Sequence, residues 1–113
     1  MKKILCSTGA LIGMPNNRDF SLIKKCVPNI NSDGFEFMMY STWYDKVHNL
    51  LKELKKCETE FPVMHCEKHI GEDLGKNADG NFYTAKEKFK VNCEIANEIG
   101  AKRMVMHLWD GIY

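Results

Sequence analysis

The sequence lacks a long apolar run and an excess of charge of either sign. A membrane-spanning helix needs roughly 20 apolar residues, whereas the apolar run at residues 4–6 ends at the polar Ser7. We therefore expect neither a signal peptide nor a membrane anchor. The formal net charge is +1, and Lys and Glu are intermixed without forming a basic block. Duplex nucleic acid and membrane surfaces are therefore not expected as partners.

Closely spaced cysteine pairs are also absent. The five cysteines are odd in number and scattered, and none are in C-x-x-C spacing. This pattern fits free thiols in a reducing compartment better than a framework of disulfides. We therefore predict a cytoplasmic protein. The cysteines are Cys6, Cys26, Cys57, Cys66 and Cys93.

Several catalytic motifs are missing as well. The sequence contains no H-E-x-x-H, no G-x-S-x-G and no G-x-x-x-x-G-K-[ST], which leaves zinc proteases, serine hydrolases and P-loop enzymes unsupported. Residues 65–67 match H-x-E, but the P-C-x-x-C partner of the nucleobase deaminases is absent. Residues 9–13 do not form a G-x-G-x-x-G turn, so a dinucleotide site is not indicated.

The residues that are present alternate between two kinds of segment. With 113 residues, 44% hydrophobic and 27% charged, the chain is expected to form a single globular domain over residues 1–113. Apolar runs predict strands at residues 3–8, 34–40, 63–66 and 102–107, and helices are predicted after Asp19, from about Asp45, and from Thr84 to Ile99. A long loop is predicted over residues 68–83. Strands separated by helices indicate an α/β fold with parallel pairing through right-handed crossovers.

Local signals support the later two helices. Val47, Leu50, Leu51, Leu54 and Cys57 fall at spacings of three and four, which predicts one apolar stripe on a helix. In the last helix, Thr84-Ala85-Lys86-Glu87 has the spacing of a capping box, and Gly100 is a typical helix stop.

Two histidines occupy equivalent places at the ends of neighbouring predicted strands. His65 and His107 each follow a Val-Met pair, and 42 residues separate them, about one strand-helix unit with a long loop. Adjacent strands lie about 4.8 Å apart, so the two imidazoles could share one metal ion. Zn²⁺ or Mn²⁺ would suit imidazole with carboxylate ligands. The alternative is that each is a hydrogen-bonded structural histidine.

Carboxylates near these histidines are candidate catalytic groups. Glu67 would share one side of the sheet with His65 if the strand continued, and His69 would follow in the same way. Glu36 lies inside an apolar run, where a charge is costly unless it is paired or lines a site. An ion pair with Lys or Arg is the alternative for Glu36, and Lys68 is either solvated or a contact for an anionic substrate group.

Other side chains near the strand ends are candidates for the pocket wall. Trp43 and Trp109, with Tyr40, could contact a sugar ring or could simply be core anchors. Cys66 is expected to face away from His65 and to pack in the core. Asp110 is either a supporting residue behind the site or exposed to solvent.

Taken in order, four segments resemble a known family. ILCSTGALIG, DGFEFMMY, PVMHCEKHIGE and NCEIANEIGAKRMVMHLWDG are similar to the amino-terminal half of the xylose isomerase-like TIM barrels, the sugar phosphate isomerases and epimerases related to endonuclease IV. The resemblance implies that Glu36 faces the barrel interior and that His65 and His107 line the active site. It also implies a divalent metal, Mn²⁺, Mg²⁺, Co²⁺ or Zn²⁺, that grips a sugar or sugar phosphate while carboxylates move a proton.

The chain departs from this family in length. A barrel of eight strands takes about 250 residues, whereas this chain has four predicted strands in 113 residues. We therefore expect a truncated half-barrel that is inactive alone. A noncatalytic remnant or binding module is the alternative, and an endonuclease IV-like phosphodiesterase is a third option that the lack of a basic surface weakens. Open sheet edges and exposed Phe, Met and Val side chains predict a homo-oligomer.

Overall fold

The computed structural model describes residues 3–75 and 81–108, which form a sheet of strands with helices packed on it. The strands are β1 (Cys6–Ser7), β2 (Phe35–Met38), β3 (Val63–His65) and β4 (Arg103–Val105). The α-helices are α1 (Ser21–Cys26), α2 (Val47–Lys55), α3 (His69–Gly75) and α4 (Asn81–Ile99). Short 3-10 segments lie at Thr8–Ala10, Met14–Asn16, Val27–Asn29 and Ser41–Lys46. Each predicted strand is present, in a shorter form than predicted.

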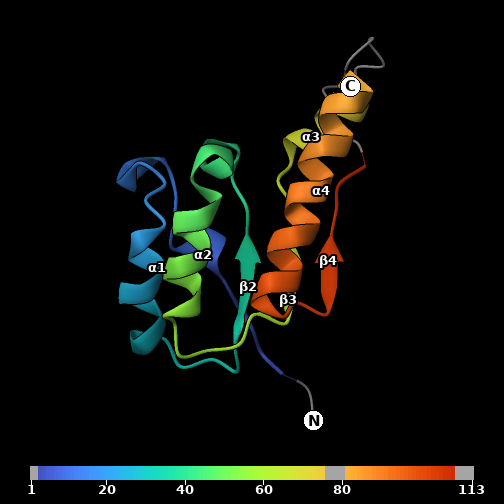
Figure 1. Ribbon diagram of the computed structural model, residues 1–113. Helices are drawn as coiled ribbons and strands as arrows, with labels where there is room; N and C mark the ends of the chain where they lie inside the picture. Colours follow the sequence, from blue (N-terminus) through green and yellow to red (C-terminus); the bar gives the residue numbers. More distant parts are fainter. Residues whose placement is uncertain (1–2, 76–80, 109–113) are drawn as a thin grey trace.

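The strands form one parallel sheet in the order β1-β2-β3-β4. Figure 1 shows α1, α2 and α4 together on one side of this sheet. Since every strand runs in the same direction, the carboxyl ends lie along one edge, where loops can build a site. The α/β class and the parallel pairing predicted from the sequence are confirmed.

Alternation along β2 separates a covered face from an open face. Phe35 and Phe37 are buried beneath the helices, while Glu36 and Met38 between them are half-buried on the other face. We expected Phe side chains on the open face, and this was wrong, because the aromatic rings have the opposite alternation and fill the helix-covered core. The open face carries Met38, Val63 and Val105 instead.

The predicted loop over residues 68–83 contains a helix and the start of another. Within it lie α3 and the first residues of α4, and α3 packs against α4 through Ile70 and Leu74. The glycines predicted a loop because glycine has a low helix propensity. The burial of Ile70 and Leu74 against α4 outweighs that cost. Thr84 lies inside α4 and not at its start, so the predicted capping box is wrong. Gly100 does end the helix, with a φ of 76°.

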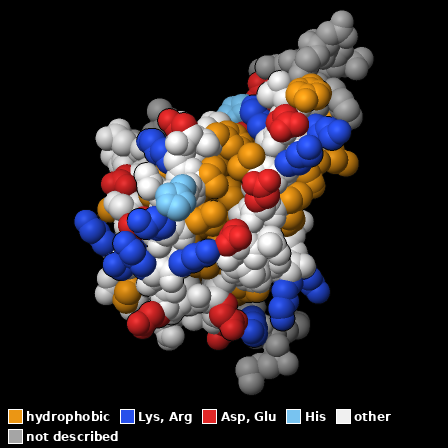
Figure 2. Space-filling model, in the orientation of Figure 1, with side chains coloured by type: hydrophobic (Ala, Val, Ile, Leu, Met, Phe, Trp, Pro, Cys, Tyr) orange, Lys and Arg blue, Asp and Glu red, His pale blue; other side chains and the backbone are white. Residues whose placement is uncertain are grey.

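The helix-covered side presents a mixed surface. Figure 2 shows Lys and Arg side chains interspersed with Asp and Glu, and a band of hydrophobic side chains between the charged groups. Among the described residues, no helix is long and apolar enough to cross a membrane.

Candidate functional site

Two histidines meet at the carboxyl edge of the sheet. His65 ends β3 and pairs with Val105 of β4, and His107 lies two residues further along the chain on the same face. Their Nε2 atoms are 3.0 Å apart, and their ring centroids are 4.9 Å apart. The structure therefore brings together the two imidazoles that the sequence places at equivalent strand ends.

The proton of His65 is fixed by the backbone. Nδ1 of His65 lies 3.0 Å from the carbonyl oxygen of Cys66. Because a carbonyl oxygen accepts, Nδ1 donates this hydrogen bond, and Nε2 is the ring nitrogen that faces His107. A backbone carbonyl on the second ring nitrogen is a common support for a metal-binding histidine.

The two nitrogens fit neighbouring positions around one metal ion. At a metal–nitrogen distance of about 2.0–2.1 Å, nitrogens 3.0 Å apart subtend roughly a right angle at the ion. Within the described ranges, no group of three or more His, Cys, Asp or Glu side chains is placed to hold an ion. The histidines therefore supply part of a donor set, and water or ligand oxygens would have to supply the rest.

A pocket of about 360 Å³, lined by both polar and apolar side chains, surrounds the histidine pair. It opens at the carboxyl ends of β2, β3 and β4, so residues distant in the sequence share its wall. Six of the residues that the sequence analysis considered for the site line it, together with Arg18, Met38, Met39, Ser41 and Cys66. These six are Tyr40, His65, Glu67, Lys68, His69 and His107.

Glu67 is buried at the base of this pocket. Its side chain is 1% exposed, and Oε2 accepts hydrogen bonds from the amide of His69 and from His69 Nδ1, the latter at 2.7 Å. Oε1 is buried without a hydrogen-bond partner of normal geometry among the described residues. Glu67 would share one side of the sheet with His65 only if the strand continued, but β3 ends at His65 and the Glu67 side chain is buried.

The backbone of Glu67 is hydrogen-bonded to a side chain of α4. The amide of Glu67 donates to Asn92 Oδ1 at 3.2 Å, and Asn92 Nδ2 donates to the Tyr44 hydroxyl at 3.1 Å. Burial, together with the negative charge of Glu67, raises the pKa of Tyr44. The Tyr44 phenol therefore stays protonated at neutral pH and can serve as a hydrogen-bond donor within this network.

Glu36 lies on the open face but outside the pocket. It pairs in register with Ser7 on one side and Val63 on the other, one row below Met38 and His65. It is half-buried, and no ion pair joins it to a Lys or Arg of the described chain. Glu36 therefore shares the open face of the sheet with His65, one row beneath it.

Two of the predicted substrate contacts have clear positions. Lys68 is exposed and lines the pocket. Trp43 is 1% exposed and packs among Phe20, Phe37 and Tyr40 in the core, so it does not reach the pocket wall. The prediction of Trp43 as a sugar contact fails because the 3-10 segment after β2 turns the indole inward.

The remaining candidates divide into a core residue and two positions outside the described residues. Cys66 is buried with Ile70 and Ala85, as its predicted orientation away from His65 requires. Burial raises the pKa of its thiol to about 11, so it is not a thiolate at neutral pH. Trp109 and Asp110 lie outside the described residues.

Sequence reasoning missed Arg18, which also lines the pocket. Asn17 and Arg18 have φ angles of 55° and 49°, a conformation that few residues other than glycine adopt. The Arg18 guanidinium lies 5.4 Å from the centroid of the Tyr40 ring. The Asn-Asn pair before Arg18 was the available signal for such a turn, because Asn tolerates left-handed backbone.

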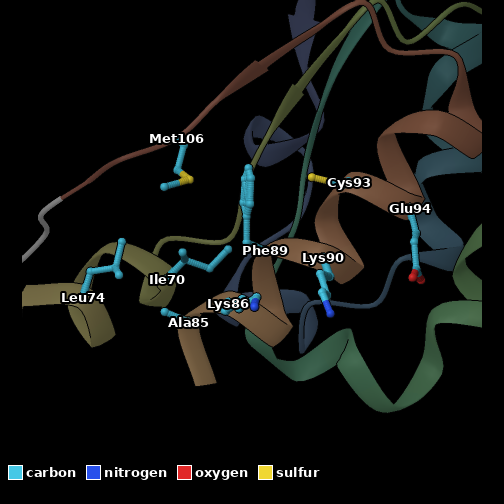
Figure 3. A pocket seen from close by; sticks show the side chains of 9 residues that line it. All are labelled: Ile70, Leu74, Ala85, Lys86, Phe89, Lys90, Cys93, Glu94 and Met106. Carbon is cyan, nitrogen blue, oxygen red and sulfur yellow. The ribbon is translucent and has the colours of Figure 1, made fainter. Parts of the chain in front are cut away.

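A second, apolar groove of about 740 Å³ lies beside this site. Figure 3 shows Ile70 and Leu74 of α3, Phe89 of α4 and Met106 near β4 converging on it. Lys86, Lys90 and Glu94 also line it and come from α4. Its lining is mainly apolar and includes no histidine, so the pocket with the histidine pair is the better candidate site.

Comparisons with known proteins do not place the chain in a family. No family model, curated protein or solved structure matches it. The function must therefore be argued from the geometry of the strand-end pocket.

Proposed function

We propose that the chain forms a half-barrel of the xylose isomerase-like type and carries part of a metal-dependent site for sugar isomerisation or epimerisation. The observation that carries this proposal is the 3.0 Å approach of His65 Nε2 and His107 Nε2 at adjacent strand ends. Two imidazoles converging in this way, with one tautomer fixed by the backbone, suit a shared divalent cation.

The architecture supports the half-barrel. In a TIM barrel, consecutive parallel strands lie side by side, helices cover the outside, and the active site is at the carboxyl ends. The order β1-β2-β3-β4, the helices on one face and the pocket at the carboxyl edge all agree with this arrangement.

The residues of the pocket have distinct proposed roles. His65 and His107 would hold Mn²⁺, Mg²⁺, Co²⁺ or Zn²⁺, and such an ion when bound would polarise the oxygens of a sugar as a Lewis acid. Glu67 orients His69 through its hydrogen bond to Nδ1, and Lys68 contacts the substrate at the rim. Glu36 would contribute a carboxylate from the row below. Because the described residues supply no third ligand, we expect this chain alone to bind metal without turnover.

Metal titration tests the site directly. We expect Mn²⁺ or Co²⁺ to bind the purified chain, measured by calorimetry and by Mn²⁺ electron paramagnetic resonance. His65→Ala and His107→Ala should each weaken binding by at least about tenfold, because each removes a direct ligand. His48→Ala, at an exposed position of α2, is the matched control and should bind like the wild type. Unchanged binding in both site variants would overturn the proposal.

A noncatalytic metal-binding module is the second candidate, favoured by the small donor set of the described residues. Water-proton relaxation of the Mn²⁺-loaded chain separates the two. If the site chelates sugar oxygens, xylose or glucose should displace water from the ion and change the relaxation rate, whereas glycerol at the same concentration should have a smaller effect. An identical response to all three would favour the binding module.

A further inference from the structure

We propose that Arg18, with Lys68, forms an anion-binding subsite in the strand-end pocket, and that the ligand is a sugar carrying a phosphate or carboxylate group. The sugar part of this inference rests on the proposed function, whereas the anion part rests on Arg18 and its surroundings. Both cations line the pocket that His65 and His107 also line.

The backbone holds Arg18 in place from two directions. Its amide donates to the carbonyl oxygen of Gly13 at 2.9 Å, and its own carbonyl accepts from the indole Nε1 of Trp43 at 2.7 Å. Trp43 is fully packed in the core, so this contact ties the turn to the rigid part of the fold. A left-handed φ at two consecutive residues other than glycine is unfavourable, and these hydrogen bonds help to maintain it.

The side chain of Arg18 is also positioned. Its guanidinium lies 5.4 Å from the centroid of the Tyr40 ring, and the Tyr40 hydroxyl donates to the carbonyl oxygen of Ile12 at 3.1 Å. The Tyr40 ring is therefore fixed in place, and the guanidinium packs against it in a cation–π contact. A positioned guanidinium loses less conformational freedom when it binds an anion than a free one does.

The charges around Arg18 favour an external anion. No ion pair within the described chain engages Arg18 or Lys68, whereas Lys3, Lys55 and Lys88 each pair with a carboxylate. Glu67, the carboxylate among the pocket-lining residues, points Oε2 to His69. The guanidinium fork matches phosphate or carboxylate oxygens, with two parallel hydrogen bonds possible.

The dimensions of the pocket suit such a ligand. A cavity of about 360 Å³ lies within the range of small-molecule sites. Because Arg18 and Lys68 share its wall with the histidine pair, one sugar derivative could contact the cations and the histidines together. Aromatic and sulfur side chains, Tyr40 and Met38, supply apolar surface between the polar groups.

Calorimetric titration of the metal-free chain tests the anion subsite separately from the metal site. The probes are glucose, glucose 6-phosphate and gluconate, measured with EDTA present. We expect at least one of the two anionic probes to bind about tenfold more tightly than glucose, with the preference weakening as NaCl increases. The stronger of the two identifies phosphate or carboxylate as the preferred group.

Arginine variants provide the decisive comparison. Arg18→Gln should reduce the affinity for the anionic probe to that for glucose, and Arg18→Lys should retain part of the preference. Arg103→Gln, which changes the other arginine of the chain on an exposed strand position outside the pocket, should have no effect. Circular dichroism checks that each variant folds. If Arg18→Gln does not fold, the subsite is tested by two other results: loss of anion preference in Lys68→Gln, and tighter binding of charged than of neutral probes by the wild type.

Equal binding of glucose and both anionic probes by the wild type, or an unchanged preference in folded Arg18→Gln, would overturn the subsite. These results do not depend on metal. Loss of metal binding with an intact anion preference would remove the proposed function alone, whereas metal binding without an anion preference would remove this inference alone.

Discussion

Cys66 and His65 are adjacent in the chain, yet their side chains have opposite surroundings. Both residues line the pocket, but His65 is half-buried at the strand end, while the Cys66 side chain is buried in a cluster with Ile70 and Ala85. Burial, with a smaller contribution from Cys93, raises the pKa of Cys66 from 9.0 to about 11. One residue beyond the end of β3, the chain thus passes from the histidine pair to a buried apolar cluster.

The pH dependence of stability follows from this shift. The unfolded chain releases the Cys66 proton near pH 9, whereas the folded chain keeps it until about pH 11. The folded state binds more protons in this interval, so stability should fall as pH rises from 9 to 11. Urea unfolding with reductant present should show a shallower decline in Cys66→Ala. Cys26→Ala in α1 is the control, and an equal decline in both variants would contradict the assignment.

Single residues also show what the sequence could predict of the site. The positions of His65 and His107 followed from strand alternation and equivalent spacing, because parallel strands align their carboxyl ends. Trp43 was misplaced because a residue just after a strand can turn either way, and the 3-10 segment turned it into the core. Arg18 was missed because its left-handed backbone depends on hydrogen bonds to Gly13 and Trp43 that form only in the folded chain.

At the scale of elements, α3 packs directly against the backbone of His107 and Leu108, which follow β4. Gly71 of α3 lies so close to the backbone of His107 that an added Cβ would overlap its carbonyl oxygen. The position of His107 therefore depends on a glycine in a neighbouring helix. This glycine is needed for close approach and has no positive φ.

Substitution at Gly71 should therefore affect both stability and the metal site. Gly71→Ala should lower the free energy of unfolding by about 1–3 kcal/mol, since overpacking forces the helix or the strand end to move. Mn²⁺ affinity should fall as well, because His107 is displaced from His65. Gly13→Ala, whose Cβ would meet Pro15 at an ordinary 3.6 Å, is the control for both measurements. Wild-type stability and affinity in Gly71→Ala would contradict this packing.

The elements were predictable to different degrees. The stripe through Leu50 and Leu54 predicted α2 because burial and helical period agree there. The helix α3 was not predicted, because its glycines favour a loop and its support comes from distant side chains of α4. Local propensity is a weak guide wherever tertiary contacts contribute most of the stability.

At the scale of the whole molecule, the sheet formed by residues 3–75 and 81–108 has two outer strands and one face without helices. β1 and β4 are the outer strands of the sheet. Val105 on β4 is 41% exposed and Leu108 beyond it is 70% exposed. Unpaired edges and exposed apolar side chains favour association with another strand. A second copy of this chain, joined edge to edge through β4, would cover these groups.

We expect the chain to self-associate in a concentration-dependent manner. Size-exclusion chromatography with light scattering should give a mass above the 13.1 kDa of the monomer. The double variant Val105→Glu with Leu108→Glu should shift the chain toward monomer, because charges at the edge oppose pairing. Tyr83→Glu, at an exposed apolar position of α4, is the control. A stable monomer at every concentration would contradict this expectation.

Because helices cover one face of the sheet, mutations on its two faces should have different effects. Ser7, Glu36, Val63 and Arg103 form one row across the open face, and the core side chains Phe35, Phe37 and Met64 occupy the other face. Mutations in the first set alter what the sheet touches, while mutations in the second alter whether it folds. Substitutions on the open face should therefore change the fold less than substitutions among the core side chains.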